Sequence, residues 1–131
     1  DFATHTVNAI QSGLYAFLAH PDVFGVSYEG WTAEATACCR DICRAAIAAD
    51  IPLEINGYGL RKKPKADEGT MRPQYPVEKF WEIAGEEGVK AVVSSDAHRP
   101  IDVWSNTDDC VDWAKRHGVE VVNELIAEKI E

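Results

Sequence analysis

The sequence predicts an α/β fold whose strands run parallel. Short apolar runs alternate with longer segments in which apolar residues recur at helical spacing. The segments between successive strands are long enough for the crossovers that parallel pairing requires. With 131 residues, 46% of them hydrophobic, the chain is expected to form a single domain over 1–131.

The first half of the chain is expected to hold two helices and two strands. Apolar residues at helical spacing predict a helix over 3–13, which Gly13 would end, and the apolar run 14–19 predicts a buried strand. A loop over 23–31 precedes a helix over 32–49, which Thr32 would cap. A second strand is expected over 51–56.

The second half continues the alternation after a long loop, 57–75. Pro76 suits the first turn of a helix that would end at Gly88, and 89–94 predicts a third strand. A helix is expected over 107–117, a fourth strand over 119–122 and a terminal helix over 123–130.

The composition excludes several classes of partner. The net charge of −9 disfavours nucleic acid and anionic membrane surfaces, which both require clustered Lys and Arg. No apolar run is long enough for a membrane helix and the chain starts with no secretory signal, so a cytoplasmic location is expected. The four cysteines lack zinc-finger spacing, and we expect small, reduced side chains.

Polar residues with metal-ligand chemistry follow three of the predicted strands. His20 follows the first strand, Glu54 and Asn56 end the second, and Asp96 and His98 follow the third. Parallel α/β folds place their sites at these carboxyl ends. Imidazole and carboxylate suit Zn²⁺, Mn²⁺ or Fe²⁺, and a bound metal would supply hydroxide near neutral pH. A structural role in turns or in the core is the alternative for each residue taken alone.

The loop 57–75 adds a cluster of positive charge. Five of the 13 basic residues fall within it: Arg61, Lys62, Lys63, Lys65 and Arg72. Because this loop follows the carboxyl end of a strand, it is expected to lie over the same end of the sheet as His20, Asp96 and His98. A cationic loop in that place is expected to bind phosphate. A solvated loop without a binding role is the alternative.

Three segments together resemble the histidinol-phosphatase-like branch of the PHP (polymerase and histidinol phosphatase) superfamily. They are Leu18–Phe24 (LAHPDVF), Leu53–Lys62 (LEINGYGLRK) with Tyr75-Pro76 behind it, and Ser94–His98 (SSDAH). The motifs occur in the family's order and span about residues 8–104.

The resemblance implies a distorted (β/α)7 barrel that holds three divalent metals (Zn, Mn or Fe) and hydrolyses phosphate esters. It makes His20, Asp96 and His98 metal ligands, with Asp96 and His98 also catalytic. It places Glu54 and Asn56 along the substrate side of the site and gives Arg61 the substrate phosphate. Arg72 and Arg99 are further phosphate-binding candidates by location alone.

The family's opening H-x-H motif, its following histidines and its bridging glutamate have no counterpart here. A complete barrel needs about 250 residues, so the resemblance implies the C-terminal part of one. With about one ligand per metal, the chain alone is expected to be inactive. The missing strands would leave a sheet edge that a second copy could cover.

Two alternatives remain open at this stage. The substrate is expected to be a small phosphate monoester of histidine biosynthesis, but a nucleotide or another sugar phosphate fits the same chemistry. A PHP-derived module that has lost catalysis and serves interaction is the alternative from another class.

Overall fold

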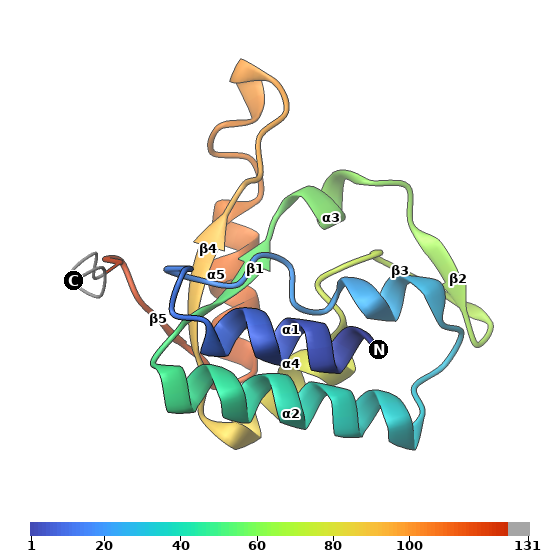
Figure 1. The fold of residues 1–131 in the computed structure, drawn as a ribbon. Coiled ribbons are helices and arrows are strands. Elements are labelled where there is room, and N and C mark those ends of the chain that lie inside the picture. Colours follow the sequence, from blue (N-terminus) through green and yellow to red (C-terminus); the bar gives the residue numbers. More distant parts are fainter. Residues whose placement is uncertain (126–131) are drawn as a thin grey trace.

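The computed structural model describes residues 1–125 and has a mixed α/β fold (Figure 1). The helices are α1 (Phe2–Gln11), α2 (Ala33–Ala49), α3 (Tyr58–Arg61), α4 (Glu78–Glu87) and α5 (Thr107–Arg116), with 3-10 segments η1 (Val23–Ser27) and η2 (Pro100–Asp102). The strands are β1 (Leu53–Asn56), β2 (Lys65–Asp67), β3 (Thr70–Arg72), β4 (Lys90–Ser94) and β5 (Glu120–Val121). Within the described range, no helix has the length and apolar character needed to cross a membrane.

The central sheet has three parallel strands in the order β1-β4-β5 and, over residues 1–125, does not close into a barrel. β4 follows β1 through α4, and β5 follows β4 through α5, so strands that are adjacent in the sheet also follow one another in the chain. Both pairs are parallel, and the predicted parallel pairing is confirmed. Connections between parallel strands are right-handed in nearly all proteins. Because the order β1-β4-β5 moves across the sheet in one direction, two right-handed connections put α4 and α5 on the same face of the sheet.

Side-chain alternation divides the two faces of β1. Leu53 and Ile55 are fully buried in the core, where they lie with residues of α2, α4 and α5. The largest fully buried side chains of this core are Phe80 and Trp81 of α4. Glu54 and Asn56 point to the opposite face, by the period-two alternation of a strand. The sheet therefore separates an apolar core from a polar face that carries the candidate site.

The thiols behave as small apolar side chains. Cys39, Cys43 and Cys110 are fully buried, Cys38 is half-buried, and all four are free. Burial raises the pKa of Cys110 to about 12, so this thiol stays protonated. The expectation that the cysteines pack as small buried side chains is therefore met by Cys39, Cys43 and Cys110.

The predicted strand over 14–19 is wrong in extent. Only Leu18 pairs there, in a single parallel bridge to Leu53, with bonds from Leu18 N to Pro52 O (3.1 Å) and from Glu54 N to Leu18 O (2.9 Å). Leu14 and Tyr15 are 77% and 58% exposed instead of buried. An apolar run needs neighbours on both sides to become a buried strand, and this segment has one.

The loop predicted over 57–75 contains structure that was missed. A one-turn helix, α3, follows β1 directly, and β2 pairs antiparallel with β3. The hairpin turn uses Glu68 and Gly69, both at positive φ (46° and 82°), which is the geometry of a two-residue hairpin loop. Strands β2 and β3 have three residues each and pair mostly polar side chains, such as Lys65 with Arg72 and Asp67 with Thr70. Strands this short and polar show no alternation of apolar residues in the sequence.

The other predicted helices and strands up to residue 122 differ only at their ends, and the loop predicted over 23–31 contains the 3-10 segment η1. The helix predicted from Pro76 begins at Glu78, because the backbone of Val77 is extended. Residues 123–125 are not helical, and the rest of the predicted terminal helix lies outside the described residues.

The segment 14–19 leads to a first testable prediction. The main-chain amides of Phe17 and Ala19 have no hydrogen-bond partner among residues 1–125, and this segment carries no charge in a chain of −9. Beside it lies an apolar groove of about 260 Å³, lined in part by Leu14, Tyr15 and Ile51. We expect a second copy to pair along this edge, and light scattering coupled to gel filtration to show a dimer.

A matched pair of variants separates this edge from general surface stickiness. Tyr15→Lys should convert the dimer to a monomer, because it places charge on the pairing edge. Trp104→Lys removes an even more exposed aromatic elsewhere (81% against 58%) and should leave the dimer intact. A monomeric wild-type protein at tens of micromolar would contradict the prediction.

Candidate functional site

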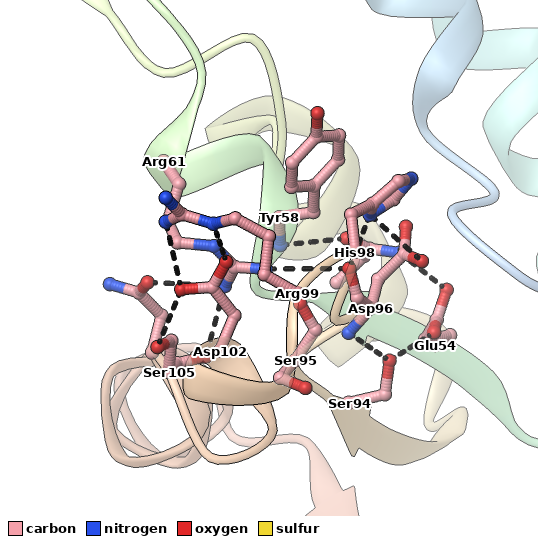
Figure 2. A network of polar contacts seen from close by, with 12 residues as sticks. Glu54, Tyr58, Arg61, Ser94, Ser95, Asp96, His98, Arg99, Asp102 and Ser105 are labelled. Atoms are coloured by element: carbon pink, nitrogen blue, oxygen red, sulfur yellow. Dashed lines mark hydrogen bonds and ion pairs between the residues drawn. The ribbon is translucent and has the colours of Figure 1, made fainter.

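Three segments converge at the carboxyl end of the sheet. The register of β1 against β4 pairs Glu54 with Val92 and Asn56 with Ser94, so both strands end side by side. The Leu18 bridge to β1 brings His20 to the same end. Asp96 lies two residues beyond the end of β4. These residues therefore meet at one end of the sheet, as expected from the sequence, and Figure 2 shows Glu54, Asp96 and His98 there.

The Glu54 carboxylate is the hub of this cluster. Its Oε2 accepts from the His20 main-chain amide (2.8 Å) and from Asn56 Nδ2 (3.0 Å), and its Oε1 accepts from Ser94 Oγ (2.6 Å). Asn56 Nδ2 also donates to Asp96 Oδ2 (3.0 Å). Glu54 is 4% exposed and receives three hydrogen bonds, which is how a buried carboxylate is tolerated without a cation.

His20 and Asp96 occupy left-handed backbone conformations, with φ of 29° and 47°. Left-handed φ is unfavourable for residues with a Cβ and is found mostly where surrounding contacts impose it. Here the contacts are the Glu54 carboxylate on the His20 amide and Ser94 Oγ on the Asp96 amide (3.2 Å). The backbones of His20 and Asp96 are therefore held by one hydrogen-bond network, because Ser94 Oγ also donates to Glu54.

The His20 ring has an unpartnered nitrogen. Its Nδ1 is buried and makes no hydrogen bond within the described range. Buried polar atoms without partners are rare in folded proteins and ask for an explanation, such as a bound ion. The neighbouring ring is Tyr75, whose centroid lies 6.0 Å away.

His98 is held in one orientation at the rim. Its Nδ1 lies 2.8 Å from the Asp96 carbonyl oxygen, and its ring stacks on Tyr58 with centroids 4.1 Å apart. Because a carbonyl only accepts, Nδ1 carries the proton and Nε2 keeps its lone pair. This is the arrangement in which a histidine offers Nε2 to a metal.

The guanidinium of Arg61, the first of the predicted phosphate-binding arginines, is engaged mainly in main-chain contacts. Arg61 donates to the carbonyl oxygens of Ser95 (2.6 Å) and Asp96 (3.3 Å) with Nη2, and to that of Ser105 (3.1 Å) with Nη1. Arg61 thus lies beside the cluster and ties the end of β4 to the start of α5.

Within the described residues, Arg72 and Arg99 contact other groups and not the cluster. Arg72 pairs with Asp67 and donates to the Gly25 carbonyl (2.9 Å), so it anchors the β2–β3 hairpin to η1. Arg99 pairs with Asp102 (2.9 Å), and this ion pair lowers the pKa of the Asp102 carboxyl. Arg61 and Arg72 of the basic loop therefore hold neighbouring segments of the chain together.

Sequence reasoning missed the residues that organise the site. Strand alternation places Ser94 on the face of Asp96, but its hydrogen bond to Glu54 has no separate signal. Tyr58 was also missed: it joins the site through α3, where its ring stacks on His98 and lies beneath the Lys62 ammonium that the basic cluster had already suggested.

The donors present were compared with what a metal ion requires. In the part of the chain that is described, no three His, Cys, Asp or Glu side chains lie close enough together to hold one. The orphaned His20 nitrogen, the Asp96 carboxylate and His98 Nε2 have the right chemistry as separate ligands. They do not make a complete metal site by themselves.

Comparison with known proteins gives no relative: no family model, no curated protein and no solved structure matches the chain.

A second buried carboxylate lies just beneath the site and supports it. Asp22 Oδ2 accepts from the Val77 amide (2.7 Å) and from Trp81 Nε1 (3.0 Å), which joins the segment behind His20 to the start of α4. Burial raises the pKa of Asp22 to about 6, although these hydrogen bonds oppose the shift.

We expect Asp22→Ala to lower the free energy of unfolding by about 3 kcal/mol, because it leaves two buried donors without an acceptor. Asp22→Asn keeps an oxygen that can accept both bonds and should cost much less. Urea unfolding of the two variants at the same pH checks this, and equal losses would contradict the assignment.

Proposed function

We propose that the chain is the C-terminal part of a PHP-type (β/α)7 barrel and supplies part of the metal site of a phosphoesterase. The observation that supports it best is the network that joins His20, Glu54, Asn56 and Asp96 across three consecutive parallel segments. Such convergence at strand carboxyl ends is where barrel enzymes hold their sites. The order β1-β4-β5 also suits an arc of a barrel.

In this proposal His20, Asp96 and His98 are the metal-binding residues. Zn²⁺, Mn²⁺ or Fe²⁺, when bound, would lower the pKa of a water molecule and offset the charge of a phosphate group. Glu54 fixes the His20 backbone, and Asn56 orients the Asp96 carboxylate through one hydrogen bond. These two residues would hold the ligands in place along the substrate side of the site.

The proposal requires more ligands than residues 1–125 bring together. Binding energy for a metal cluster comes from several ligands fixed at once, and isolated donors bind weakly. We therefore expect this chain alone to be inactive and further polypeptide to complete the site.

The substrate would be a small phosphate monoester. Histidinol phosphate follows from the sequence resemblance, whereas a nucleotide or a sugar phosphate would use the same metals and the same attack on phosphorus. The chemistry of the cluster does not distinguish the leaving groups, so the three substrates belong in one assay.

The test is phosphate release by the full-length gene product. We expect turnover of histidinol phosphate in the presence of Mn²⁺, Zn²⁺ or Fe²⁺, loss of turnover with a chelator and recovery when metal is returned. A nucleoside monophosphate and glucose 6-phosphate are measured alongside. Absence of metal-dependent hydrolysis of all three would reject the enzyme.

A second candidate is a PHP-derived module without catalysis. The engagement of Arg61 and Arg72 with main-chain carbonyls favours it, because two of the three arginines expected to bind phosphate serve the fold. A module of this kind would give no hydrolysis with any metal and would keep its fold when the metal ligands are replaced.

A further inference from the structure

The cations around the site divide into two groups. Arg61 and Arg72 are bonded to main-chain oxygens, and Lys65 Nζ donates to the carbonyls of Val26 (2.8 Å) and Tyr28 (2.6 Å). Donors used in this way are not available to a ligand unless the loops they hold come apart. Of the five basic residues in the segment, this leaves Lys62 and Lys63.

Lys62 is the one of these two that lies at the site. Its Nζ is 4.9 Å from the centroid of the Tyr58 ring and 4.9 Å from that of Tyr75. Tyr58 stacks on His98, and Tyr75 lies beside His20, so the ammonium is held between the rings that flank the two imidazoles.

The surroundings of Lys62 keep its charge available. No carboxylate of the described residues lies within ion-pair distance of Lys62, and a hydrogen bond with Tyr75, with a smaller attraction from the Asp96 carboxylate, raises its pKa. Aromatic faces attract an ammonium but carry no net charge, so they orient it without neutralising it. A fixed, charged and unneutralised ammonium is suited to an incoming anion.

We propose that Lys62 binds the phosphate group of the substrate and that Arg61 is a positioning residue. The inference rests on the proposed phosphoesterase function. Arg61, at the end of α3, bonds to the carbonyl oxygens of Ser95 and Asp96 and to that of Ser105 before α5. These bonds fix the end of α3 beside the cluster, and the next residue in the chain, Lys62, is positioned by them. Lysine binds phosphate as a point charge, which suits a residue whose stem is fixed between two rings.

The test compares adjacent lysines in the full-length gene product. Lys62→Met keeps the length and the packing of the stem on both rings but removes the charge. We expect it to raise KM for the phosphate monoester about tenfold or more with kcat little changed, and to weaken inhibition by inorganic phosphate equally. Lys62→Arg should restore most of the loss. Lys63→Met, one residue further along and exposed, is the control and should match the wild type.

The outcomes separate this inference from the proposed function. If the wild type hydrolyses the ester and Lys62→Met behaves like Lys63→Met, Lys62 is not the phosphate ligand, although the enzyme stands. A rise in KM for Arg61→Lys instead would return that role to Arg61. If the wild type neither hydrolyses the ester nor binds inorganic phosphate, the function and the inference both fail.

Discussion

Gly59→Ala is expected to destabilise the protein by about 3 kcal/mol or more. A Cβ at this position would lie 2.2 Å from Tyr75 Cδ2 and 2.2 Å from the Tyr75 carbonyl oxygen. Tyr75 is 3% exposed and its backbone cannot retreat, so α3 would have to move away. Because α3 carries Tyr58, Arg61 and Lys62, the displacement would also disturb the site.

This prediction has the opposite sign from the one that helix propensity gives. Gly59 lies inside a helical turn, where alanine is ordinarily about 1 kcal/mol better than glycine. Gly88→Ala is the control: a Cβ there meets nothing within 4 Å, and its cost comes from the positive φ of 84° alone. Chemical unfolding of both variants measures the two effects, and a Gly59→Ala protein as stable as the wild type would contradict the packing.

Asp96→Asn and His20→Asn are expected to lower metal-dependent turnover of the full-length gene product at least about 100-fold. Asparagine tolerates the left-handed backbone that both positions require. At position 96 it can still accept from Asn56, and at position 20 the main-chain bond to Glu54 is unaffected. Stability should therefore change little while a ligand is removed.

Two surface variants serve as controls for these substitutions. His5→Asn and Asp108→Asn change the same residue types at exposed positions outside the cluster, and both should retain wild-type turnover. Undiminished activity of Asp96→Asn would remove Asp96 from the metal site. Loss of activity that follows loss of folding, measured by circular dichroism, would assign it a structural role.

The sequence was informative wherever a residue's position along a strand decides its place. Alternation put Glu54 and Asn56 on one face, and parallel pairing brought them beside Asp96, as the structure has them. The helix boundaries also follow from local signals such as Thr32, which caps α2 through a bond to the Ala35 amide.

The sequence was uninformative wherever long-range contacts decide. The apolar run at Leu14 and Tyr15 has the composition of a buried strand, yet its burial depends on neighbours that the described residues do not provide. Arg61 has the composition of a phosphate ligand, but its guanidinium bonds to carbonyls over thirty residues away along the chain. Neither fact has a local signature.

The central claim is that the strand-end donors His20, Asp96 and His98 belong to a metal site. Elemental analysis of the purified full-length gene product tests it most directly, without any assumption about the substrate. The account predicts at least one equivalent of Zn, Mn or Fe per chain in the wild type and a clear loss in Asp96→Asn. A wild-type protein that stays free of divalent metal after exposure to all three ions would contradict it.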